Sequence, residues 1–174
     1  DSLPFKTRGI LHRNFVFDIT IPPETLQTYY VRFKSRDTVE INLKLWDELS
    51  FSKFDHNSQL MYGIFYGAIL VLIIFNLSIY FALQYQSYLY YVATLIAFTL
   101  VEASLNGLTF EYLFSNSPEF NKLIRPILIS VVMGLTGLFS ISYLSIENRK
   151  SKTINTLKTL TNSSFAWSLS IFIL

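Results

Sequence analysis

The side chains in this sequence that could do chemistry are few. The two histidines, His12 and His56, lie far apart, and there is no cysteine. No metal-ligand spacing, nucleophile elbow or phosphate-binding loop occurs. The sequence therefore predicts no catalytic site, no metal site and no bound cofactor, and the lack of cysteine excludes disulfides and thiol chemistry.

Glu102 is the one charged residue inside the apolar segments that follow residue 57. A carboxylate within a bilayer requires a partner, a proton or a water-filled cavity. Counted from Tyr88, Glu102 lies about 21 Å along a helix, close to one membrane surface. Two interpretations stay open: a functional acid that takes part in signalling or ligand binding, or an interfacial residue.

Charged residues divide the chain into two parts. Hydrophobic residues make up 51% of the sequence and charged residues only 15%. Residues 57–101 contain no Asp, Glu, Lys or Arg, whereas eight Lys and Arg residues precede His56. The chain therefore passes from an aqueous to a nonpolar environment near residue 57. The apolar part is too long and too uncharged for an ordinary soluble domain.

Uncharged runs in the second part have the length of membrane-spanning helices. Residues 59–83 would exceed the roughly 30 Å hydrocarbon core as a helix. The predicted spans are residues 59–83, 88–106 and 126–146, with a fourth, residues 163–174, that is truncated. A buried helical core of a large soluble protein is the alternative, but successive runs of this length favour an all-α membrane bundle over residues 59–174.

The first part shows the alternation of half-buried strands. Apolar residues recur at every second position in residues 15–21, 29–33 and 39–45. The prolines at 22–23 and the polar residues 35–37 separate these runs, which predicts an antiparallel meander. Three strands bury too little surface to stand alone, so residues 1–48 are predicted to be the C-terminal end of a larger, jelly-roll-like β-sandwich. Residues 49–58 would be a linker, and the fold class mixed.

Small and polar residues in the spans are candidates for helix packing. Gly63 and Gly67 form a GxxxG pattern, and the amides of Asn76 and Asn106 could bond between helices. Packing within the bundle is one interpretation of the glycines, and a homodimer is the other.

The distribution of basic residues predicts the orientation. Residues 147–162 carry four basic residues against one acid, whereas residues 108–125 carry two of each. The positive-inside rule then places residues 147–162 in the cytoplasm and residues 1–48 outside. A net charge of +2 without a dense basic run argues against nucleic acid as a partner. Because the chain starts at Asp1 and stops inside an apolar run, we expect a fragment of a longer protein.

The chain resembles the bacterial seven-transmembrane receptors with diverse intracellular signalling modules over nearly its whole length. The stretch HRNFVFDITIPPETLQTYYVRF is similar to the end of the family's extracellular domain, and LWDELSF to its link to the membrane. YGIFYGAILVLIIFNLSIYFALQYQSYLYYVATL is similar to the first two helices, and LNGLTFEYLF to the outer loop. The uncharged first turn, residues 84–86, departs from the family pattern.

The resemblance implies a receptor, not an enzyme, in the bacterial inner membrane. Its outer domain would sense a small molecule or carbohydrate, and its helices would pass the change to the protein's own cytoplasmic module, a histidine kinase or diguanylate cyclase, which this chain lacks. The LWDELSFSKF segment, as the only covalent connection between the parts, would carry the signal. The alternatives are a transporter or membrane-enzyme subunit with an outer accessory domain, and a purely structural anchor. No ligand-binding residue can be named.

Overall fold

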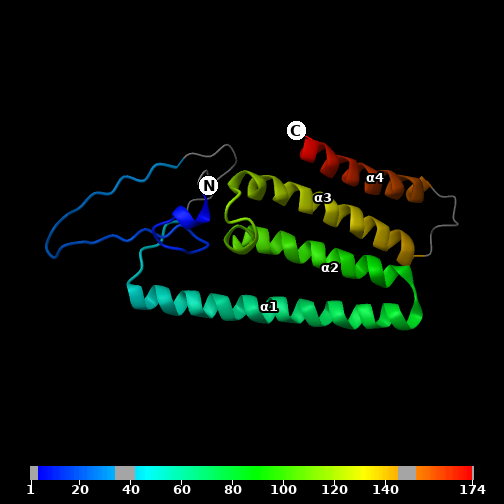
Figure 1. Ribbon diagram of the computed structural model, residues 1–174, viewed down its shortest axis with the longest axis horizontal. Coiled ribbons are helices and arrows are strands. Elements are labelled where there is room, and N and C mark those ends of the chain that lie inside the picture. The colour runs from blue at the N-terminus through cyan, green and yellow to red at the C-terminus, as the bar shows by residue number, and fades with distance from the viewer. Residues whose placement is uncertain (1–3, 34–41, 145–151, 174) are drawn as a thin grey trace. The chain divides into compact units, whose positions relative to one another are not determined.

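The structure is a computed structural model that describes residues 4–33, 42–144 and 152–173. Its elements are a short 3-10 turn η1 (Phe5–Thr7), the helices α1 (Glu48–Leu83) and α2 (Gln86–Leu105), a π-helical turn η2 (Thr109–Leu113), and the helices α3 (Pro118–Tyr143) and α4 (Lys152–Ile173) (Figure 1). The chain divides into two compact units: residues 1–16 together with 64–174, and residues 17–63.

Helices α2, α3 and α4 pack in sequence as antiparallel neighbours (Figure 1). Tyr91 of α2 lies against Phe139 of α3, with 5.4 Å between ring centroids. At the other end of the same pair, Arg125 of α3 donates a hydrogen bond from Nη2 to the carbonyl oxygen of Ser104, at 3.2 Å. These contacts fix the register of α2 against α3 at both ends.

Local sequence explains where the helices begin and turn. Gln84 has a φ of 58° and separates α1 from α2, because a left-handed residue cannot continue a right-handed helix. Pro118 begins α3 at the first helical position, where its missing N–H removes no hydrogen bond. The helices are therefore joined by connections that reverse the chain.

Three helices of the described residues are long and apolar enough to cross a membrane: α1, α2 and α3. The 20 residues of α2 extend about 30 Å, close to the thickness of the hydrocarbon core. The 36 residues of α1 extend about 54 Å, more than the core requires. Residues 49–58, predicted as a linker, lie within α1, so this stretch continues the membrane helix as a stem.

In the unit formed by residues 17–63, the stem has a capped start. The Oδ2 atom of Asp47 accepts a hydrogen bond from the backbone N–H of Ser50 at 3.0 Å. Hydrogen bonding from the Ser50 side chain, and then from its backbone N–H, lowers the pKa of the Asp47 carboxyl. Trp46 stacks on Phe54 at 5.1 Å, and the ammonium of Lys44 lies 5.7 Å from the Phe54 ring. The segment that enters the helix is therefore fixed to the first two turns of the helix.

The predicted mixed fold with a β-sandwich is wrong: no strand forms within residues 4–33, 42–144 and 152–173. Residues 15–21 and 29–33 have no regular secondary structure, and the Tyr29 hydroxyl donates a hydrogen bond to the Thr20 carbonyl oxygen at 3.2 Å. Side chains at both the apolar positions and the positions between them are exposed, among them Phe17 and Tyr30. Alternating apolar and polar side chains stabilise a strand only when other residues cover its apolar face. No described residue covers that face here. Residues 35–37 and the first part of the third predicted strand lie outside the described residues.

Candidate functional site

The N-terminal segment, residues 4–15, lies against the turn that joins α2 to α3. The backbone N–H of Phe5 donates to the carbonyl oxygen of Ser115 at 2.8 Å. The Phe5 ring, 6% exposed, meets the Phe110 ring edge-on, with 5.6 Å between centroids. Phe110 itself is 3% exposed. Residues about one hundred positions apart thus form one small apolar core at this end of the helices.

Arg8 joins this core to the rest of the N-terminal segment. Its guanidinium carbon lies 4.9 Å from the centroid of Phe5, 5.5 Å from that of Phe110 and 4.3 Å from that of Phe15. Its Nη1 donates to the carbonyl oxygen of His12 at 2.6 Å and to that of Arg13 at 3.1 Å. The segment therefore folds around one cation held by aromatic faces.

Burial and a neighbouring acid act on Arg8 in opposite directions. Removal from water disfavours the charged guanidinium and lowers its pKa, while the carboxylate of Glu111 raises it. The net pKa is lower than the ordinary value, although arginine keeps its proton at any physiological pH. Glu111 belongs to η2, so the charge of Arg8 is attracted to the turn on which the segment lies.

The turn that receives the segment has an unusual backbone. Gly107 has a φ of 77°, and a Cβ at this position would lie 3.3 Å from the carbonyl oxygen of Arg13. The π-helical residues follow directly, and within them Thr109, 1% exposed, donates from Oγ1 to Oδ1 of Asn121 in α3 at 3.0 Å. Glycine is required here both for the positive φ and for the close approach of the segment.

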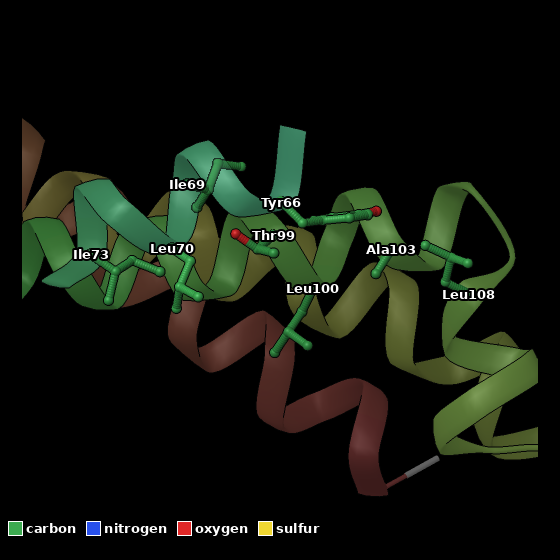
Figure 2. A pocket seen from close by; sticks show the side chains of 8 residues that line it. All are labelled: Tyr66, Ile69, Leu70, Ile73, Thr99, Leu100, Ala103 and Leu108. Atoms are coloured by element: carbon green, nitrogen blue, oxygen red, sulfur yellow. The ribbon is translucent and has the colours of Figure 1, made fainter. Parts of the chain in front are cut away.

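A second concave surface lies between α1 and α2. It is a groove of about 420 Å³ lined mostly by aliphatic side chains, and Figure 2 shows Tyr66 and Thr99 as the hydroxyl-bearing residues that line it. Within residues 64–83 of α1, Ile69 is the one buried residue among those described. The groove offers apolar surface and no charged group, which suits hydrocarbon better than a polar ligand.

The predicted polar residues of the spans bond mainly within their own helices. Asn76 donates from Nδ2 to the Leu72 carbonyl at 2.8 Å, and Asn106 donates from Nδ2 to the Glu102 carbonyl at 2.9 Å. Glu102 is half-buried, and the described residues give its carboxylate no ion pair. The structure does not bring Asn76, Asn106 and Glu102 together into one site.

The glycines that lie against another helix are not those of the GxxxG pattern. Nothing lies within 4 Å of a Cβ built at Gly63 or Gly67. In α3, by contrast, a Cβ at Gly134 would lie 2.6 Å from the Phe165 ring of α4, and one at Gly137 would overlap the Thr161 hydroxyl. The close approach therefore occurs between α3 and α4.

Two family models match consecutive parts of the chain. A family model described as "7TM diverse intracellular signalling" matches residues 58–174, and one described as "7TMR-DISM extracellular 2" matches residues 1–47. The chain belongs to this family of transmembrane signalling receptors. A search of curated proteins and a search of solved structures gave no match.

For a receptor of this family, the contact between residues 4–15 and the α2–α3 turn has a specific meaning. The N-terminal segment lies within the stretch that matches the extracellular model, and the turn lies within the stretch that matches the 7TM model. The Arg8 cluster is therefore a direct contact between the two matched parts. Among the described residues no three His, Cys, Asp or Glu side chains are grouped to hold a metal ion.

Sequence reasoning missed most of these residues. Gly134 and Gly137 were visible as a small-residue pattern with Ser130, which lies one turn before Gly134 and is 6% exposed. The Asn-Gly pair at 106–107 was a turn signal. No local pattern marks Arg8, because its rings come from residues distant in sequence.

Proposed function

We propose that this chain is the sensing and relay part of a receptor in the bacterial cytoplasmic membrane. Residues 1–47 lie outside the membrane and respond to a small molecule or carbohydrate. The helices pass the change to a cytoplasmic module of the same protein, a histidine kinase or a diguanylate cyclase. The observation that carries the proposal is the match of an extracellular model to residues 1–47, directly followed by that of a 7TM model to residues 58–174.

The stem of α1 supports a mechanical relay. Residues 48–58 add about 16 Å of helix before the predicted span, and one unbroken helix runs on to Leu83. A helix is stiff along its axis, so a rotation or shift imposed near Trp46 is carried along α1 without being absorbed by a hinge. The Asp47 cap and the Trp46–Phe54 stack hold the entry point to that helix.

The orientation is tested by cysteine labelling, since the chain contains no cysteine of its own. Two exposed residues mark opposite ends of α2: Gln86 is its first residue, and Asn116 follows its C-terminal end, after η2. In intact cells, a membrane-impermeant maleimide is expected to label an Asn116→Cys variant and to leave a Gln86→Cys variant unlabelled until the cells are opened. Labelling of Gln86→Cys alone would invert the topology and contradict an extracytoplasmic N-terminal segment.

The relay is tested by making the stem flexible in the full-length receptor. Residues 45–54 are replaced by ten residues of Gly and Ser, and output is recorded in cells given a panel of soluble mono- and oligosaccharides. The replacement is expected to abolish the response, because Gly and Ser remove the helical stem and transmit no rotation. A receptor that responds equally well with the flexible segment would contradict a relay through the stem. The matched control is a Lys53→Ala variant, which keeps the helix.

A further inference from the structure

The stem is not the only connection between the two matched parts of the receptor. Phe5, Arg8 and Phe110, with Glu111, form a noncovalent contact that we call the Arg8 latch. Its aromatic pair is buried, its cation lies within 5.5 Å of three ring centroids, and its acid belongs to the receiving turn. Loss of the Arg8 side chain would therefore remove the attraction that holds residues 8–15 against residues 107–115.

The receiving turn is π-helical over Thr109–Leu113. A π-helical turn contains one residue more than an α-helical turn needs, and such turns are rare and occur frequently at functional sites. Gly107, with its positive φ, lies two residues before η2, and Thr109 of η2 donates a hydrogen bond to Asn121 of α3. If η2 changed from a π-helical to an α-helical turn, one of the two helices that it joins would shift by about 1.5 Å and rotate by about 100° relative to the other.

We propose that the Arg8 latch is a switch: its closure holds η2 in the π-helical form and so sets the register of α2 against α3 and α4. The N-terminal segment then controls the bundle by a second route, independent of the α1 stem. This inference rests on the proposed receptor function, because it gives the latch a signal to carry. Its tests, however, need neither a ligand nor an output module.

Closure of the latch is measured by amide hydrogen exchange in the whole chain, reconstituted in nanodiscs. An Arg8→Ala variant loses three cation–ring contacts, so exchange at residues 109–113 is expected to rise by about tenfold or more. Arg32→Ala is the matched control, because Arg32 is an exposed arginine of the same N-terminal part. Exchange at residues 109–113 that does not respond to loss of Arg8 would overturn the proposal.

Transmission to the far end is measured by the distance between spin labels at Gln86 and Lys158. Both residues are exposed, and they lie near the ends of α2 and α4 remote from the latch (Figure 1). The Arg8→Ala variant is expected to shift this distance by about 1.5 Å or more, the rise of one helical residue. Faster exchange at residues 109–113 with an unchanged label distance would show that the latch affects only the turn beside it, and would overturn its role as a switch.

Conservative replacement separates opening of the latch from misfolding. An Arg8→Lys variant keeps a positive charge beside the rings of Phe5, Phe15 and Phe110. Exchange at residues 109–113 is expected to be slower in it than in Arg8→Ala, with the label distance closer to that of the original protein. Arg8→Gln, which keeps a polar side chain without the charge, is the matched control and is expected to behave as Arg8→Ala does. Equal exchange and equal label distances in the Lys and Gln variants would overturn the proposal.

Failure of the latch and failure of the receptor function give different results. If the latch is wrong, the exchange and distance measurements fail while the Gly/Ser stem replacement still abolishes the response to the sugar panel. If the receptor function is wrong, the cysteine labelling or the stem replacement fails, whatever the latch does. The two conclusions can therefore be rejected separately.

Discussion

Replacing Gly137 by leucine is expected to loosen α4 from α3 and to destabilise the helix bundle by about 1–3 kcal/mol, the usual cost of overpacking. A Cβ at this position already overlaps the Thr161 hydroxyl, and Thr161 is 4% exposed. Rotation about χ1 moves the Thr161 hydroxyl, but the Thr161 Cβ is fixed to the backbone and lies 3.1 Å from a Cβ at position 137. A leucine side chain therefore requires the two helices to separate.

Unfolding in mixed micelles with increasing dodecyl sulfate measures this loss, with Trp167 of α4 as the fluorescent reporter after Trp46→Phe. Gly67→Leu is the matched control, because nothing lies within 4 Å of a Cβ there. The control is expected to leave the stability of the bundle unchanged. Equal destabilisation by the two variants would contradict the packing described for α3 and α4.

The same pair of variants separates the two interpretations of the GxxxG pattern, packing within the bundle and a homodimer. The pattern is a correct description of a helix surface that permits close approach, but it cannot tell which helix approaches. Gly63 and Gly67 lie against open space within this chain, while Gly134 and Gly137 lie against α4. A change in oligomeric state in Gly67→Leu without loss of bundle stability would support the dimer.

Absence of charge is the sequence signal for membrane helices because it reports directly on whether a segment suits hydrocarbon or water. Residues 57–101 carry no Asp, Glu, Lys or Arg, and helices α1 and α2 cover all of them except the turn at 84–85. The same reasoning could not find the start of α1. Residues 48–58 carry charged side chains that suit water, but they are helical because Asp47 caps them and nothing interrupts the hydrogen-bond ladder.

Alternation failed as a predictor of strands for the converse reason. It reports that one face of a segment is apolar, but a strand also needs a neighbour to accept its backbone hydrogen bonds. Residues 15–21 and 29–33 run past each other with a side-chain bond from Tyr29 to Thr20 where a ladder was predicted. Pairing is a property of two segments, and sequence shows each segment separately.

The Arg8 latch was beyond sequence reasoning for a related reason. The sequence shows an arginine near several phenylalanines, which is unremarkable in a chain with 16 of them. The turn offered a better signal, because Asn106-Gly107 marks a reversal and the following residues include a phenylalanine between polar neighbours. These residues form a site only because Phe5 lies against Phe110, and that contact joins segments far apart in the sequence.

Replacing Phe110 by alanine is expected to release the N-terminal segment. Phe110 is 3% exposed and meets the Phe5 ring at 5.6 Å, and truncation of a buried phenylalanine costs about 3–5 kcal/mol. The contacts that remain include one backbone hydrogen bond to Ser115 and the attraction of Arg8 to Glu111, and each of these is individually weaker than that loss. The segment should therefore leave the turn while the helices stay folded.

Limited trypsin digestion of the chain in nanodiscs detects this release, because the segment contains Arg8 and Arg13 as cleavage sites. Cleavage after these residues is expected to accelerate by more than about tenfold in Phe110→Ala, since a protected bond is cut only when the segment opens. Tyr112→Ala is the matched control: it removes an aromatic ring from the same turn, but one that is 74% exposed. Equal cleavage rates in the two variants would show that burial of Phe110 does not hold the segment. Faster cleavage in Phe110→Ala alone would establish that the aromatic pair, and not the turn as such, fixes the N-terminal segment to the bundle.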